Sequence, residues 1–102
     1  MKLLSVLGAK VIELRLYVAG ESPNSVRAIA NLKAICDDCL PGQHRLEVVD
    51  VLEQPLRPAE DGILVTPTLL VVTPGPLQRI IGDLNDRTQV LLALGLDMPY
   101  HE

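Results

Sequence analysis

A change of hydrophobic period in the first third of the chain most constrains its fold. Residues 11–19 alternate between apolar and polar side chains, which predicts a strand. Apolar residues then recur at helical spacing over 23–40, after Ser22 and Pro23, which favour a helix start because serine caps free amides and proline suits the first turn. Residues 46–52 alternate again. A strand, a long helix and a strand in this order predict a right-handed parallel unit.

The second half of the chain predicts a buried hairpin between two helices. Residues 68–72 are apolar on both faces, which indicates a central strand, and pairing should begin after Pro67 because proline donates no hydrogen bond. The last helix should be capped by Asn85 or Asp86 and end at Gly95. The other predicted elements are a short helix over 58–61, a turn over 73–76, a strand over 77–81 and a helix over 86–94.

Composition excludes several classes of partner. The chain has 102 residues, enough for one domain with a single core, and a formal net charge of −4. That charge leaves no basic stripe to replace the counterions of nucleic acid, and it disfavours an anionic membrane surface. Tyr17 and Tyr100 are the only aromatic residues, so the core must be aliphatic and bases find no stacking platform. No apolar stretch reaches the roughly 18 residues of a membrane span.

The predicted elements follow the order βαβαββα of thioredoxin-like α/β proteins. The Thr66-Pro67 step lies where thioredoxins keep a cis proline. We expect one domain over residues 1–102, with loosely ordered ends at 1–10 and 97–102. A lysine and a short apolar run near the N-terminus are also found in signal peptides, but the run is at the lower limit of length and the first strand follows at once. We therefore expect a cytoplasmic protein.

The segment Cys36-Asp37-Asp38-Cys39 is a CxxC pattern, which raises a redox and a metal-binding alternative. In thioredoxins the pair opens the first helix, where the dipole lowers the thiol pKa. Here it lies at the helix end beside two carboxylates, which should raise the thiol pKa. Zinc normally takes four ligands, and only His44 and His101 could join the cysteines. We expect a buried and a partly exposed thiol, both reduced, and no catalytic residue, metal or cofactor.

Four segments, in order and at matching spacing, resemble the KaiB family. They are Leu16–Gly20 with Ser22–Ala28, Val49–Leu52 with Pro55, Ala59–Asp61 through Thr66–Leu69, and Arg79–Leu84. The resemblance implies a non-enzymatic clock adaptor that binds the ring ATPase KaiC and modulates its phosphorylation cycle. KaiA, or a KaiB-like histidine kinase competitor, is a further implied partner. The alternatives are a KaiB-like stress-response or signalling adaptor without a clock role and, less favoured, a redox protein using Cys36 and Cys39.

The KaiB family is known for two folds, a tetrameric ground state with a rearranged C-terminal half and a thioredoxin-like monomer that binds KaiC. Clock members have glycine and then aspartate where this chain has Ala93 and Gly95, and alanine favours a helix over glycine by about 1 kcal/mol. The long acidic tail of many members is also missing. We therefore expect a thioredoxin-like monomer, and a tetramer if the ground-state fold is populated. The residues expected to set this balance are Pro67, Gly82, Asp83, Ala93 and Gly95.

The resemblance also implies a partner face around the second strand and the Thr-Pro-Thr step, with recognition through shape and backbone pairing at a sheet edge. The family carries lysines at three sites of this face, which here are Glu47, Gly62 and Val71. Because complementary charge contributes to recognition, their loss should weaken binding to a clock-type KaiC. The predicted contact residues are Arg27, which keeps its positive charge, Arg45, Glu47, Val49, Val65, Thr66, Pro67 and Val71.

Overall fold

The computed structural model describes residues 11–73 and 75–96. The elements are β1 (Ile12–Val18), α2 (Pro23–Cys39), β2 (His44–Asp50), α3 (Arg57–Glu60), β3 (Thr68–Thr73), β4 (Gln78–Ile81) and α4 (Arg87–Ala93). The predicted order is therefore confirmed. The expected loose ends at 1–10 and 97–102 lie outside the described residues, as does Pro74 in the predicted turn.

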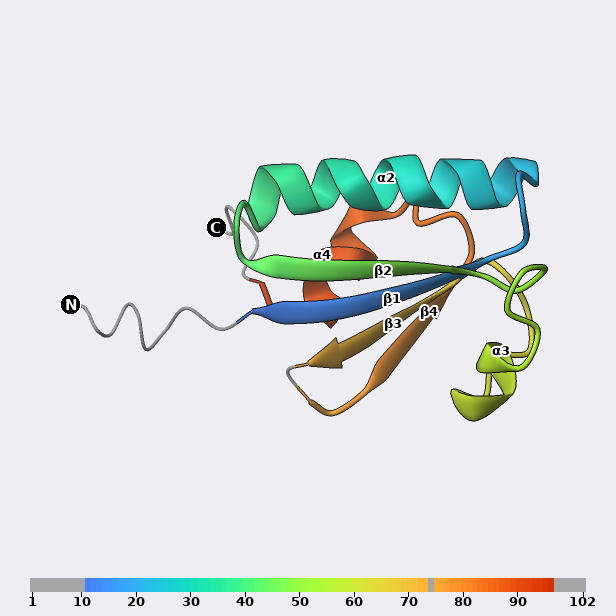
Figure 1. Cartoon of the computed structure of the whole chain (residues 1–102). Helices are drawn as coiled ribbons and strands as arrows, with labels where there is room; N and C mark the ends of the chain where they lie inside the picture. The colour runs from blue at the N-terminus through green and yellow to red at the C-terminus, as the bar shows by residue number, and fades with distance from the viewer. Residues whose placement is uncertain (1–10, 74, 97–102) are drawn as a thin grey trace.

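The sheet has the strand order β2-β1-β3-β4 (Figure 1). β1 pairs with β2 in parallel and with β3 antiparallel, and β4 pairs antiparallel with β3. The helices α2 and α4 cover one face, while α3 lies at one end of the sheet on the other side. Among the described strands, β2 and β4 are therefore the two edges, and the β1–β2 half of one face lies outside the helical layer.

Aliphatic side chains form the core, as the near absence of aromatic residues predicted. The larger cluster lies between the sheet and the two longer helices, and its fully buried members include Leu16, Leu32, Leu69 and Val90. A smaller cluster of Tyr17, Val49 and Leu70 lies on the other face, beneath residues that follow β2. β3 contributes to both clusters, which confirms that it is buried on both faces.

The second strand begins and ends two residues before the predicted segment. It ends at Asp50 because the side chain of Asp50 accepts hydrogen bonds from the amides of Gly20 (3.0 Å) and Leu52 (2.9 Å). These bonds turn the chain immediately after β2. The backbone carbonyl of Asp50 also accepts from Glu53 and Gln54, which completes the turn that leads to α3.

The two predicted helix N-caps have different outcomes. Ser22 was expected to cap α2, but its hydroxyl instead donates to Oγ of Ser25 (2.8 Å), a fully buried side chain that also accepts from the Ala19 amide. Ser22 therefore stands at the N-cap position, but its hydroxyl is oriented toward Ser25 and makes no capping bond to the helix amides. The cap of α4 is confirmed, since Asp86 accepts from the Gln89 amide at 3.2 Å.

The end of α4 confirms the prediction for Gly95. Gly95 has φ +77°, a left-handed conformation that favours glycine. Its amide donates to the carbonyl of Leu92, and the Leu96 amide donates to the carbonyl of Leu91, both at 3.0 Å. This pair of bonds is the Schellman arrangement, which satisfies carbonyls at a helix C-terminus.

Candidate partner interface

The β1–β2 half of the sheet face opposite α2 and α4 carries cross-strand charge pairs. The register places Glu13 opposite Arg45 and Arg15 opposite Glu47. Arg45 Nη1 lies 2.7 Å from Glu13 Oε2, and Arg15 Nε lies 3.0 Å from Glu47 Oε1. Opposed charges on neighbouring strands stabilise the pairing, so this face displays paired ions rather than free ones.

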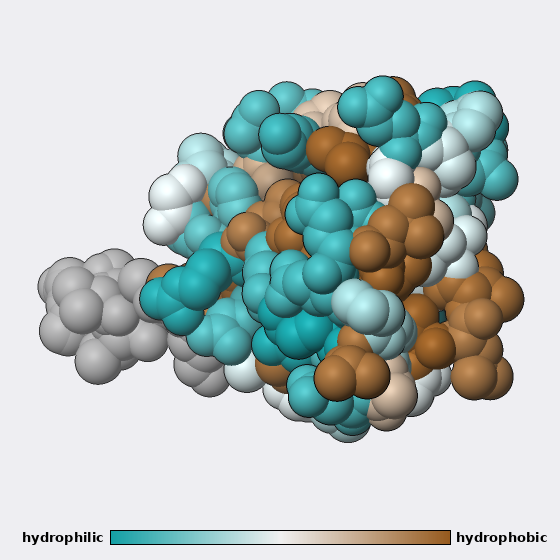
Figure 2. Space-filling model, turned by 45° about the vertical axis from the view of Figure 1, so that its right-hand side comes forward, coloured by the Kyte–Doolittle hydropathy of each residue, from teal (hydrophilic) through white to brown (hydrophobic). Residues whose placement is uncertain are grey.

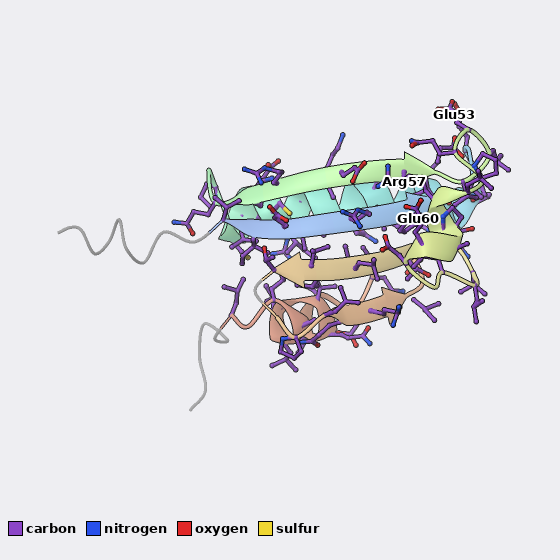
Figure 3. All side chains as sticks on the ribbon, turned by 60° about the horizontal axis from the view of Figure 1, so that its bottom comes forward. Glu53, Arg57 and Glu60 are labelled. Atoms are coloured by element: carbon purple, nitrogen blue, oxygen red, sulfur yellow. The ribbon has the colours of Figure 1, made fainter. Side chains whose placement is uncertain are left out.

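Arg57, labelled in Figure 3, reaches this face from α3. Its guanidinium contacts both carboxylate oxygens of Glu47, with Nη1–Oε2 2.9 Å and Nη2–Oε1 3.2 Å. Hydrogen bonds from Arg57, and secondarily from Arg15, hold the pKa of Glu47 below its ordinary value. The carboxylate of Glu47 is thus held by two arginines.

Asp61 connects α3 to the sheet. The Tyr17 hydroxyl donates to Asp61 Oδ2 at 2.5 Å, and Arg15 Nη1 donates to the same oxygen at 2.8 Å. The backbone carbonyl of Asp61 accepts from Arg79 of β4 at 2.7 Å. The Tyr17 hydrogen bond, followed by that of Arg15, lowers the pKa of Asp61. Asp61 therefore joins β1, β4 and the segment after α3.

Because of the carboxylates of Glu47 and Asp61, we expect the folded state to become less stable in acid. Because folding lowers both pKa values, the stability they contribute is complete above their ordinary values of 4.5 for Glu47 and 3.8 for Asp61. It is lost as the pH falls through the lower folded values. Urea unfolding midpoints should therefore decline below pH 4.5, and less so in a Glu47→Gln, Asp61→Asn variant. Identical pH slopes in the two proteins would contradict this assignment.

An apolar surface lies next to this charged face, at the end of the molecule opposite the grey terminal residues in Figure 2. Its exposed side chains are Leu52, Leu56, Leu64, Val65 and Ile81. Leu64 is 94% exposed. Exposed apolar side chains that lie together, as here, are typical of a binding surface. Two open hollows of about 250 and about 300 Å³ flank Leu64 and Val65. This end offers an apolar contact beside the paired charges.

The predicted contact residues other than Arg27 fall into three groups in the structure. Arg45 and Glu47 lie exposed on β2, and Val65 and Thr66 lie at the neighbouring apolar end. Val49, Pro67 and Val71 are buried, so in this fold they can support the surface but do not present their side chains to a partner. The Thr66-Pro67 peptide bond is cis.

Arg27 lies apart from the other predicted contacts, on α2 in the helical layer. Its Nε is 3.2 Å from Oδ2 of Asp83, and it also bonds the side chain of Asn24. Asn31 of the same helix donates to the Asp83 carbonyl at 2.8 Å, so α2 holds the segment that follows β4. Asp83, predicted to influence the fold balance, is thereby placed in a contact between the N-terminal and C-terminal halves.

The sequence analysis missed the residues that organise the charged face. Arg15, Arg57, Tyr17 and Asp61 are separated by up to 46 positions, and only the fold brings them together. The alternation in β1 indicates that Arg15 points away from the core. Nothing in the local sequence indicates that α3 returns over β2, so the partners of that arginine were not predictable.

The CxxC residues lie where they were expected, at the C-terminal end of α2. Cys36 is buried and Cys39 half-buried, and both are free thiols. Burial, with the nearby Asp37 carboxylate, raises the pKa of Cys36 to about 11. His44 uses Nδ1 to contact the Leu40 carbonyl at 2.8 Å. Within the described residues no cluster of three metal-ligating side chains occurs, and His101 lies outside them.

Alkylation should distinguish the two thiols. At neutral pH and under native conditions, iodoacetamide should modify Cys39 and leave Cys36 unmodified, because Cys36 is 1% exposed and its thiol pKa is raised to about 11. Mass spectrometry of tryptic peptides measures both sites, and unfolding in urea should make both reactive. Rapid native modification of Cys36 would contradict the burial assignment.

The fold and the open sheet face define a thioredoxin-like α/β domain. The N-terminal domain of Synechococcus elongatus SasA superposes with a TM-score of 0.70 at 26% identity, covering 90% of both chains. The Deadhead thioredoxin of Drosophila superposes with a TM-score of 0.68 at 10% identity, covering 88% of this chain and 87% of that one, which supports the fold alone.

Sequence comparison then gives the family. The KaiB domain profile matches residues 15–96. The circadian clock oscillator protein KaiB of Rippkaea orientalis is 52% identical over 93 residues, covering 91% of this chain and 88% of that protein. That of Prochlorococcus marinus subsp. pastoris is 48% identical over 97 residues, covering 95% and 89%. The chain belongs to the KaiB family. Across the part of the chain that the structure describes, none of the helices is both long and apolar enough to cross a membrane.

Proposed function

We propose that this chain is a non-enzymatic clock adaptor that acts in the cytoplasm, binds a KaiC-type ring ATPase and modulates its phosphorylation cycle. The KaiB clock proteins that resemble it over about nine-tenths of its length support a clock role. The observation that carries the proposal is the open β2 edge, where β2 pairs only with β1 among the described strands. A free edge offers a row of backbone groups to a partner strand.

The neighbouring surface supports the same function. Val65 and Thr66 lie beside two hollows at the apolar end, close to the exposed Leu64. Interfaces commonly combine an apolar contact with a polar rim, and here the paired charges of the sheet face provide that rim. The thioredoxin-like form described above is the state proposed to bind, with the free protein a monomer. The similarity in fold to the SasA domain supports the proposal that a domain of that fold competes with this chain for the ring ATPase.

Size-exclusion chromatography with light scattering tests this proposal. The chain alone should elute as a monomer, and mixing with a KaiC-type ATPase in ATP or in ADP should give co-elution with the ring. Val65→Asp should abolish co-elution because it places a charge in the apolar contact. Leu92→Asp is the matched control, since Leu92 is also exposed but lies on α4 in the helical layer. Absence of co-elution in both nucleotides would refute the proposal.

A further inference from the structure

The two cysteines of the chain lie in the last turn of α2, one inside the core and one at its edge. Cys36 is 1% exposed and belongs to the core cluster between the sheet and the longer helices. Cys39, the last residue of α2, is half-buried and packs against the same cluster. A small molecule in solution can therefore reach Cys39, whereas Cys36 is surrounded by protein.

Helix geometry brings the two thiols close together without placing them at bonding distance. Residues i and i+3 of an α-helix have Cα atoms about 5 Å apart, within the range that a disulfide spans. Their Cβ atoms are about 5 to 6 Å apart, whereas a disulfide holds them at about 3.8 Å. A bond between Cys36 and Cys39 therefore requires the last turn of α2 to distort. A helix end allows this more readily than a helix interior, because helix ends fray.

The same turn of α2 also contacts α4. Asp38, between the two cysteines, has Oδ2 2.9 Å from Nη2 of Arg87, the first residue of α4. The core cluster that contains Cys36 also contains Val90 and Leu94, from α4 and its C-terminal end. A distortion at the end of α2 should therefore reach α4 through an ion pair and through shared packing (Figure 1).

We propose that Cys39 is an oxidation site for hydroperoxides and that Cys36 is its resolving thiol, so that a reversible disulfide unwinds the last turn of α2. First, the sulfur of Cys39 attacks the O–O bond of the peroxide and becomes a sulfenic acid, and the peroxide leaves as water or an alcohol. The sulfur of Cys36 then displaces the sulfenic hydroxyl group, and the Cys36 proton leaves with it as water. The two thiols are oxidised by two electrons, and the peroxide is reduced by two.

The position of the pair suits a regulatory modification rather than catalysis. Disulfides of cytosolic proteins are usually transient, and one that distorts a helix is more easily reduced than an unstrained one. The helix C-terminus and the neighbouring carboxylates disfavour a thiolate, so the reaction should be slow and should need roughly millimolar peroxide. The inference does not depend on binding to a ring ATPase, so its test leaves the proposed function untouched.

Mass spectrometry of the full chain treated with about 1 mM hydrogen peroxide tests the chemistry. The tryptic fragment 34–45 holds both cysteines, and it should lose about 2 Da, the mass of the two thiol hydrogens. The fragment should then resist alkylation in urea until dithiothreitol restores its mass. An unchanged mass, or a disulfide that joins two chains, would overturn the proposal.

Single variants assign the two roles. In Cys36→Ala the sulfenic acid has no resolving thiol, so dimedone, which captures sulfenic acids, should label Cys39. In Cys39→Ala no label should appear at Cys36, because that thiol is buried. Cys39→Ala changes a half-buried position and keeps this test valid if Cys36→Ala does not fold. Labelling of Cys36 in Cys39→Ala would overturn the assignment of Cys39 as the oxidation site.

Amide hydrogen exchange tests the structural consequence. Oxidation should accelerate exchange at residues 36–40 by about tenfold or more, and to a smaller extent at 87–94, while residues 28–34 of the same helix stay unchanged. Asp38→Asn keeps both thiols but weakens the contact with Arg87, so its increase at 87–94 on oxidation should be smaller than that of the native chain. The Cys36→Ala, Cys39→Ala variant is the matched control and should show no change with peroxide. Unchanged exchange at 36–40 in a chain that has formed the disulfide would show that α2 does not unwind, which overturns the proposed switch.

Discussion

Replacing Asp61 with alanine is expected to lower the free energy of unfolding by about 2 kcal/mol, because it leaves the Tyr17 hydroxyl without its short hydrogen bond. Tyr17 is fully buried, and its remaining contact is to the Arg57 carbonyl at 3.3 Å. The same change removes an ion pair to Arg15. Urea unfolding followed by circular dichroism measures the loss, and amide hydrogen exchange should show the greatest local increase over residues 57–62.

Two further variants separate the hydrogen bond from the charge. Asp61→Asn retains an oxygen acceptor for Tyr17 and should cost clearly less than Asp61→Ala. In a double-mutant cycle, Tyr17→Phe should make the additional cost of Asp61→Ala much smaller, because no buried hydroxyl remains to be satisfied. Additive effects of Tyr17→Phe and Asp61→Ala would show that this bond does not hold α3 to the sheet.

The position of Asp61 links folding to the proposed recognition surface. It directly follows α3, which carries Arg57, and it precedes the segment with the exposed Leu64 and Val65. Loosening this residue should therefore disturb both the clamp on Glu47 and the apolar end. Both the Arg57–Glu47 contact and the apolar end depend on the position of α3. This helix has only four residues, none of them buried, so it depends on its contacts to the sheet.

Period and breaker residues were sufficient to predict the elements of this fold. The alternation in β1, the helical spacing of α2 and the doubly apolar β3 each reflect burial against a neighbouring layer, and burial is recorded in local sequence. Ser22 shows the limit of local signals. Its hydroxyl was assigned to the helix end, but it is oriented toward the buried Ser25 three residues later, to which it donates. That orientation depends on the burial of Ser25, which the local pattern does not show.

The candidate interface was less predictable than the fold. The family resemblance placed Arg45 and Glu47 on the partner face, but the sequence could not pair Glu47 with Arg57, because that contact depends on α3 folding back over β2. It also placed Val71 on the partner face, where the structure buries that side chain in the core. Position in a family pattern identifies a region, whereas the register and packing decide which side chains a partner can reach.

Restoring the glycine and aspartate of the family pattern at positions 93 and 95 should strongly destabilise α4. Ala93→Gly removes a favourable helix residue, and Gly95→Asp places a side chain at φ +77°. Together they should destabilise α4 by about 2 kcal/mol, a change of about 30-fold in an equilibrium constant. The NMR spectrum should then show a second set of signals for residues 87–94, with faster amide exchange there, if the two folds are close in free energy.

A matched pair of substitutions, one within α2 and one in the turn after it, separates this effect from general destabilisation. Ala30 is an exposed residue within α2, and Gly42 has φ +71° with open space around it, as Gly95 has. The Ala30→Gly, Gly42→Asp variant should therefore lose similar overall stability without a second state confined to residues 87–94. Asp83 connects the C-terminal segment to α2 through Arg27. Asp83→Asn should therefore increase the population of the second state in the α4 variant and not in the control. Indistinguishable exchange at 87–94 in the two double variants would show that α4 does not set the balance between folds.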